Sequence, residues 1–195
     1  MLNIPAMLGA VGTALGLVRA VPQLVVLLRR REAFGVSVDT AVTSSIVSFG
    51  WVAYGLLTRQ YYVSLATGAS GVIFAMIAIA ALRFGRHWRE FRIAPLWFVV
   101  LACAGMLAGK QGLGVVLPLS VLAANLPQLR LAYREANLTD LSLGTWLLSM
   151  TDGLIWGTYA FIQHDPSIMV YGGFQVATSG LIVALKLARA APRHA

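Results

Sequence analysis

Charged residues are scarce in this sequence. Asp, Glu, Lys and Arg make up 11% of its 195 residues, whereas hydrophobic residues make up 58%. The mean hydropathy is +0.77, and a soluble domain would seldom carry so little charge on its surface. The sequence therefore predicts an integral membrane protein with almost no domain outside the bilayer, and it excludes catalysis by a soluble module.

Cysteine is nearly absent as well. Cys103 is the single cysteine, which excludes an intramolecular disulfide and a cysteine-based metal site. His87, His164 and His194 lie far apart in the sequence, so we expect no metal site, and no cofactor is implied. The net charge of +8 comes from basic residues at helix ends rather than from a basic face interleaved with aromatic residues. Nucleic acid is therefore not expected as a partner.

Long apolar runs separated by short polar connectors predict seven transmembrane helices, each near the length of about 20 residues that a crossing requires. They cover residues 5–28, 37–57, 61–82, 93–109, 112–131, 141–162 and 167–188. Twelve Lys and Arg lie at one set of helix ends, whereas Arg59 and Lys110 lie at the other. The positive-inside rule then places the N-terminus outside and the C-terminus in the cytoplasm. Thirteen Arg against two Lys suggest a bacterial inner membrane, so we expect a multi-pass plasma membrane protein.

An internal repeat emerges when the sequence is shifted by 105 residues. Polar and aromatic residues then coincide, which chance hydrophobic similarity would not produce. The shift superposes Pro22, Gln23, Ser44, Trp51, Tyr54 and Gly68 on Pro127, Gln128, Ser149, Trp156, Tyr159 and Gly173. We therefore predict an all-α fold of two parallel three-helix repeats, residues 1–86 and 111–195, joined by a linker helix within residues 87–110.

The repeated motifs resemble a known superfamily. A helix ending in Pro-Gln, a basic turn and a second helix with Trp-x-x-Tyr resemble the PQ-loop superfamily, and two such units joined by a linker helix look like the SWEET sugar transporters. The segment 156–159, followed by 164–166, is similar to the corresponding SWEET segment. The resemblance covers about residues 8–187. It implies a protein that is not an enzyme and that lets a mono- or disaccharide diffuse across the bilayer by alternating access.

Two kinds of site residue follow from this resemblance. Pro22 and Pro127 each remove an intrahelical hydrogen bond, and Gln23 and Gln128 are placed to satisfy the freed carbonyls, so these pairs are predicted hinges. A small polar solute, the expected partner, would bind between residues of both repeats. The predicted binding residues are Trp51, Trp156, Asp152, Thr67, Gly172, Ser44, Ser149 and Asn125. Thr67 and Gly172 occupy positions at which the family carries asparagine. The sequence does not predict the oligomeric state.

Two charges are predicted to lie within the membrane. Asp152 falls near the middle of its helix, where a carboxylate costs at least ~2.5 kcal/mol, and it shares a helix face with Ser149 and Trp156. Arg19 lies one turn before Pro22. Arg19 and Asp152 could form a structural ion pair, or Asp152 could bind substrate or carry a proton, and the sequence leaves both readings open.

Two alternatives to sugar diffusion are also left open. Asp152 favours a proton-coupled transporter of amino acids or other small metabolites, similar to cystinosin, because an intramembrane carboxylate suits proton coupling. A receptor that keeps the fold without transporting, as the KDEL receptor does, is compatible with the missing asparagines. An intramembrane enzyme is not expected, because the sequence reveals no nucleophile and base at matching depth.

Overall fold

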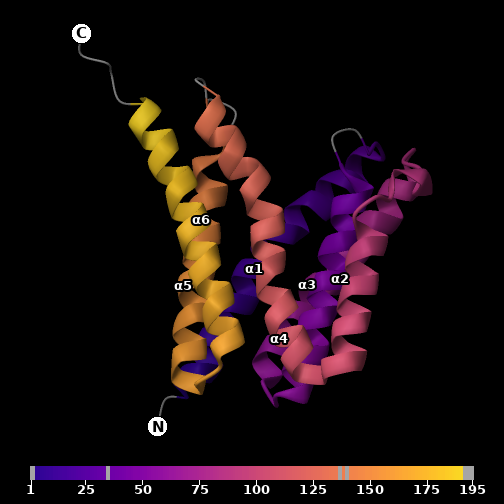
Figure 1. Ribbon diagram of the computed structural model, residues 1–195. Coiled ribbons are helices and arrows are strands. Elements are labelled where there is room, and N and C mark those ends of the chain that lie inside the picture. The colour runs from indigo at the N-terminus through magenta and orange to yellow at the C-terminus, as the bar shows by residue number, and fades with distance from the viewer. Residues whose placement is uncertain (1–2, 34–35, 136–137, 139–140, 191–195) are drawn as a thin grey trace. The chain divides into compact units, whose positions relative to one another are not determined.

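The computed structural model describes residues 3–33, 36–135, 138 and 141–190. Within these residues the chain forms six α-helices and one short 3₁₀ helix, η1 (Figure 1). The elements are α1 (Ile4–Arg30), α2 (Val38–Leu57), α3 (Tyr61–Arg83), η1 (Trp88–Glu90), α4 (Ala94–Arg134), α5 (Leu143–Gln163) and α6 (Pro166–Ala190). The all-α class predicted from the sequence is confirmed.

Most of these helices suit a lipid environment. Five of them, α1, α2, α3, α4 and α6, are long and apolar enough to cross a membrane. Large apolar side chains such as Met106 and Leu107 are almost fully exposed on the surface of the protein, which contact with lipid explains. Helices satisfy their own backbone hydrogen bonds, as the bilayer interior requires. The protein is therefore a multi-pass integral membrane protein.

The expectation of seven separate helices is corrected by α4. The segments 93–109 and 112–131, predicted as two helices, both lie in this single 41-residue element. Its backbone is interrupted at Gly109, where φ is 53° and ψ is −134°, a conformation outside the helical region. A Cβ added at Gly112 would overlap the carbonyl oxygen of Ala104, and one added at Gly105 would lie 3.6 Å from Leu113. The chain therefore folds back on itself around Gly109.

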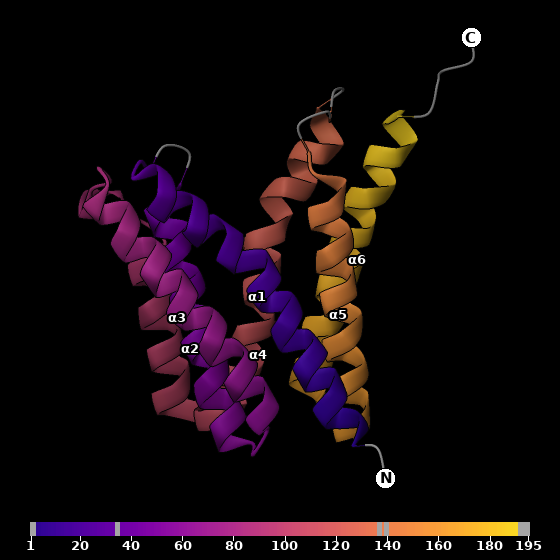
Figure 2. The same cartoon turned by 180° about the vertical axis from the view of Figure 1, so that it is seen from behind.

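The chain divides into two compact units, Met1–Leu117 and Pro118–Ala195, and each is described here by itself. In the first unit α3 packs against both α1 and α2 (Figure 2). In the second unit α5 packs against α6. The repeat boundaries predicted from the sequence remain a prediction.

Serine residues fix the start of equivalent helices in the two units. The Oγ atom of Ser37 accepts a hydrogen bond from the backbone N–H of Thr40 at 3.2 Å, which caps α2. Ser142 does the same for Thr145 at 3.3 Å at the start of α5. Such caps satisfy a donor that the first turn of a helix otherwise leaves unpaired. Ser37 and Ser142 are related by the shift of 105 residues, so the same local signal begins both helices.

Basic side chains near the ends of α3 and α6 hold the loops that precede α2 and α5. Arg86 Nε donates to the carbonyl oxygen of Ala33 at 3.2 Å. Lys186 Nζ donates to the carbonyl oxygens of Leu138, at 2.8 Å, and of Leu141. Ala33 and Leu138 are also related by the shift of 105 residues. In each unit, a basic side chain therefore holds the loop before a helix in place. Arg86, just beyond α3, holds the loop before α2, and Lys186 of α6 holds the loop before α5.

Candidate functional site

A buried polar cluster joins α4 to α6 in the second unit. Asn125 Nδ2 donates to Gln175 Oε1 at 3.2 Å and to Thr178 Oγ1 at 2.8 Å. All three side chains are buried. The sequence predicted Asn125 as a binding residue but did not single out Gln175 and Thr178, although a polar pair three residues apart on an apolar helix was the available signal. In this structure Asn125 fastens two helices together.

Asp152 lies buried between α5 and α6. The hydroxyl of Tyr171 donates to its Oδ2 atom at 2.9 Å, and the side chain is only 4% exposed. Ser149 and Trp156, expected on the same helix face, are buried as well. Arg19 belongs to the first unit and Asp152 to the second, so their ion pair remains a prediction. Tyr171 is a partner of Asp152 that was not predicted from the sequence.

Tyr171→Phe is expected to lower the free energy of unfolding by about 1–3 kcal/mol, because it leaves the buried carboxylate of Asp152 with one donor fewer. Asp152→Asn keeps an acceptor oxygen for the Tyr171 hydroxyl and is expected to cost less. Thermal unfolding of the purified variants in detergent measures both effects. Unchanged stability of Tyr171→Phe would show that this hydrogen bond does not stabilise the α5–α6 contact.

The repeated Trp-x-x-Tyr motif forms the same aromatic contact in both units. The ring centroids of Trp51 and Tyr54 lie 5.5 Å apart with the rings at 86°, and those of Trp156 and Tyr159 lie 5.5 Å apart at 73°. These edge-to-face pairs stabilise one turn of helix. All four side chains are buried, so neither tryptophan lies in a lipid-facing aromatic belt.

The other residues predicted for a solute site have varied surroundings. Thr67 Oγ1 donates to the carbonyl oxygen of Val63, one turn earlier in α3, at 2.7 Å. Gly172 of α6 lies against Gly153 and Gly157 of α5, so closely that a Cβ added to it would approach their backbones to 2.7 Å. Ser44 is half-buried in α2. The Thr67 hydroxyl thus bonds within its own helix, and Gly172 allows α5 and α6 to pack closely.

The predicted hinge residues lie within helices. Pro22 falls inside α1 and Pro127 inside α4, and both helices continue past them. Gln23 and Gln128 are exposed. Hinge motion at these positions remains a prediction.

Ser70 is one of three half-buried serines of the first unit, together with Ser44 and Ser48. It is half-buried near the middle of α3, within the sequence Gly68-Ala69-Ser70-Gly71. A Cβ added to Gly16 of α1 would lie 3.0 Å from Ser70 Oγ, so α1 passes close to this hydroxyl. For Ser70 the described residues provide no hydrogen-bond partner, whereas Ser45 donates to the Gly71 carbonyl at 3.0 Å. Ser70 is not among the residues predicted from the sequence, because no histidine or other base accompanies it in the pattern.

The histidine closest in sequence to Ser70 does not lie beside it. His87 follows the end of α3 and precedes η1, where its backbone N–H donates to Glu90 Oε1 at 3.0 Å. Thirteen residues of α3 separate Ser70 from Arg83, which at 1.5 Å per residue is roughly 20 Å. Within the described residues, no group of three or more His, Cys, Asp or Glu is placed to hold a metal ion.

Comparison with known proteins gives a fold and a family. The solved structure of a eukaryotic SWEET transporter is similar with a TM-score of 0.75, covering 95% of this chain and 96% of that chain, at 14% sequence identity. At that identity the likeness shows the fold alone. No curated protein matches the chain. Residues 17–126 match the family defined by the Rhomboid domain.

The Rhomboid match corrects several expectations drawn from the sequence. It overturns the assignment to the SWEET family and the PQ-loop superfamily, and with it the transport of a sugar or metabolite, the receptor alternative, the small polar solute as partner and the absence of enzymatic activity. The resemblance rested on short motifs, and Trp-x-x-Tyr forms a contact within one helix turn in each unit. A motif with such a packing role does not determine a family.

The matched segment contains the whole of α2 and α3, the Gly-flanked Ser70 and the fold-back of the chain at Gly109. It covers more than half of the 195 residues, and the chain therefore belongs to the Rhomboid family.

Proposed function

We propose that this protein is an intramembrane serine protease that cleaves the transmembrane segment of another membrane protein, with Ser70 as the nucleophile. Members of the Rhomboid family are intramembrane proteases that act on membrane proteins. Ser70 lies inside the matched residues and near the middle of a helix that is long and apolar enough to cross the membrane. The position of this hydroxyl is the observation that carries the proposal.

The state of the serines leaves Ser44, Ser48 and Ser70 as half-buried candidates in the first unit, and of these Ser70 lies in the glycine-containing segment 68–71. A serine nucleophile needs a hydroxyl that a substrate can reach and that no other acceptor already holds. Ser45 and Ser64 are buried and donate to the carbonyl oxygens of Gly71 and Val52, respectively. Ser37 caps the N-terminus of α2. Ser70 is half-buried and has no hydrogen-bond partner among the described residues.

A serine-directed fluorophosphonate probe tests the proposal without knowledge of the substrate. The purified full-length chain, reconstituted in liposomes, is expected to be labelled, and Ser70→Ala is expected to abolish labelling. Ser48→Ala is the matched control, because Ser48 is also a half-buried serine of the first unit and lies in α2. Absence of labelling in the unmodified protein, or equal labelling of Ser70→Ala, would overturn the assignment of Ser70.

We infer in addition that α4 crosses the membrane twice, which gives seven crossings with the N-terminus outside and the C-terminus in the cytoplasm of a bacterial inner membrane. The 41 residues of α4 correspond to about 60 Å of helix, twice the hydrocarbon thickness of about 30 Å. The fold-back around Gly109 supports two antiparallel crossings. The distribution of Lys and Arg supports the orientation of two parallel three-helix repeats.

Accessibility of single cysteines tests this topology. In a Cys103→Ser background, Arg59→Cys and Lys110→Cys are expected to react with a membrane-impermeant maleimide in intact cells. Glu32→Cys is expected to react only after the cells are permeabilised, since it lies among the arginines assigned to the cytoplasmic side. Protection of Lys110→Cys together with labelling of Arg59→Cys would contradict a turn of α4 at the outer face.

A further inference from the structure

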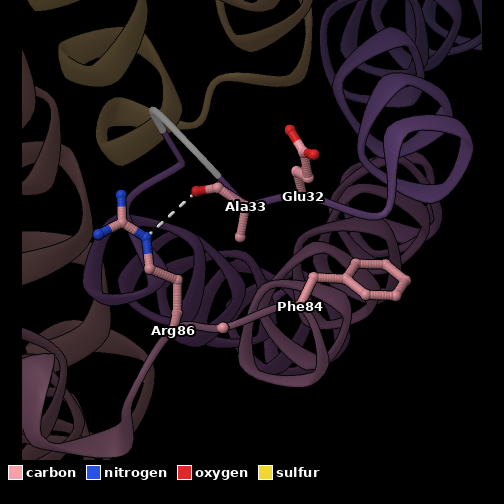
Figure 3. A pocket seen from close by; sticks show the side chains of 5 residues that line it. Glu32, Ala33, Phe84 and Arg86 are labelled. Atoms are coloured by element: carbon pink, nitrogen blue, oxygen red, sulfur yellow. Dashed lines mark hydrogen bonds between the residues drawn. The ribbon is translucent and has the colours of Figure 1, made fainter.

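Two neighbouring hollows lie at the basic end of the first unit, where α1 and α3 end. One has a volume of about 330 Å³ and is lined by Glu32, Ala33, Phe84, Gly85 and Arg86 (Figure 3). The other has a volume of about 300 Å³ and is lined by Pro22, Gln23, Val26, Leu27, Arg30, Glu32 and Val36. Glu32 belongs to both linings, so the two hollows adjoin. Neither is explained by cleavage at Ser70, which lies near the middle of α3.

The linings of these hollows combine cationic and apolar side chains. Arg30 and Arg86 supply guanidinium groups, whereas Val26, Leu27 and Phe84 supply apolar surface. Val26 is half exposed on α1, so the apolar lining reaches the outer surface of the unit. Figure 3 shows Ala33 between the side chains of Glu32 and Arg86. This mixture suits a ligand with an anionic head and apolar chains.

The surrounding charges favour an anion. Seven arginines lie in this part of the chain, at positions 29, 30, 31, 83, 86, 89 and 92, against Glu32, Asp39 and Glu90. Two of these carboxylates have partners already. Asp39 accepts hydrogen bonds of 2.9–3.1 Å from the backbone N–H groups of Arg92, Ile93 and Ala94, and Glu90 lies 3.5 Å from Arg86. The excess of guanidinium groups gives this end a positive potential.

Part of the lining of the hollows belongs to the hydrophobic core of the first unit. Leu27 and Ala33 belong to a core cluster with Ile77, Ala78 and Ala81 of α3, and Phe84 packs against it. Arg86 is held by its hydrogen bond to the Ala33 carbonyl. A ligand would therefore meet a lining whose backbone is already in place, which lowers the entropic cost of binding.

We propose that the joined hollows bind one anionic phospholipid. Its phosphate lies against Arg30, and its acyl chains follow Val26 along the surface of α1. Basic pockets at the membrane surface recognise anionic headgroups through this combination of charge and apolar contact. The exposed apolar lining favours a lipid over a free phosphate ion.

Lipid titration of the purified full-length protein in detergent tests the site. Native mass spectrometry is expected to show saturable binding of one phosphatidylglycerol and weaker binding of phosphatidylcholine of the same chain length. Arg30→Gln is expected to weaken phosphatidylglycerol binding by about fivefold, the contribution of one basic residue near an anionic lipid. Arg29→Gln removes the same charge from the neighbouring position of α1, outside both linings, and is expected to retain binding.

Two further measurements distinguish binding at this site from general electrostatic attraction of the lipid to the protein. Val26→Ser removes apolar lining at an exposed position and is expected to weaken lipid binding without changing the melting temperature in lipid-free detergent. Equal weakening by Arg29→Gln and Arg30→Gln would overturn the proposal in favour of non-specific attraction. Competition by inorganic phosphate at the same concentration as phosphatidylglycerol would show a phosphate site and would overturn the assignment to a lipid.

Discussion

Ser70→Ala is expected to reduce cleavage of a membrane-spanning peptide by about 10⁴-fold or more in kcat/KM, because removal of a serine nucleophile leaves only binding and charge stabilisation to assist the reaction. The measurement uses the full chain in liposomes and a quenched fluorescent peptide with a single apolar span. That span carries helix-breaking residues near its outer end, since a helical peptide bond is hydrogen-bonded and shielded until the helix unwinds locally. Release of fluorescence reports the initial rate.

Two substitutions control for general damage to the fold. Ser48→Ala removes another half-buried hydroxyl of the first unit and is expected to retain the rate of the unmodified protein. His87→Ala is also expected to retain it, because His87 lies beyond the end of α3, roughly 20 Å along the helix from Ser70. Cleavage by Ser70→Ala at the unmodified rate would remove Ser70 from the mechanism. Loss of cleavage in His87→Ala would contradict the geometry of α3.

The sequence predicted the class of the protein because hydropathy is a property of continuous segments. The helices begin and end within a few residues of the predicted segments, and the polar connectors at Arg59 and His164 separate helices as expected. The connector at Lys110 directly follows Gly109, where the backbone of α4 leaves the helical region between the two predicted segments. Hydropathy placed the boundary between the segments 93–109 and 112–131 at this glycine, but it carries no information on the backbone conformation, in which Gly109 has a positive φ and the helical pattern resumes at once.

Partners across helix interfaces were not predictable from the sequence. The contacts of Asn125 with Gln175 and of Asp152 with Tyr171 join residues that are 50 and 19 positions apart. Such contacts depend on how each helix is rotated about its axis. A polar side chain in an apolar helix indicates that a partner is needed but not which helix supplies it.

Short motifs misled the assignment of family for a related reason. The second tryptophan of the repeated Trp-x-x-Tyr motif packs on the tyrosine one turn later, as the first does, so local stability suffices to explain the motif. Glycines in an apolar helix commonly allow close helix packing, and one of those around Ser70 does so. A Cβ added to Gly71 would lie 3.1 Å from Ser48 Cβ. A packing role for Gly71 is compatible with a chemical role for its neighbour Ser70, and the sequence analysis did not consider both together.

Gly172→Ala is expected to destabilise the second unit strongly, lowering the free energy of unfolding by about 1–3 kcal/mol. The added Cβ would lie 2.7 Å from the Gly153 carbonyl oxygen and from Gly157 Cα, and 2.8 Å from Gly157 N. These are backbone atoms of α5, which cannot move aside as a flexible side chain can. α5 and α6 would therefore have to separate, which weakens the packing on which helix association in a membrane depends.

Gly173→Ala is the matched control for this contact. The substitution is the same and the position is adjacent on α6, but a Cβ added at Gly173 meets nothing within 4 Å. The control is expected to be neutral or to stabilise by up to about 1 kcal/mol, because alanine favours the helix over glycine. Thermal unfolding in detergent and partial unfolding in sodium dodecyl sulfate measure the difference. Equal stability of the two variants would mean that α5 and α6 do not approach as closely as the Gly153, Gly157 and Gly172 backbones indicate.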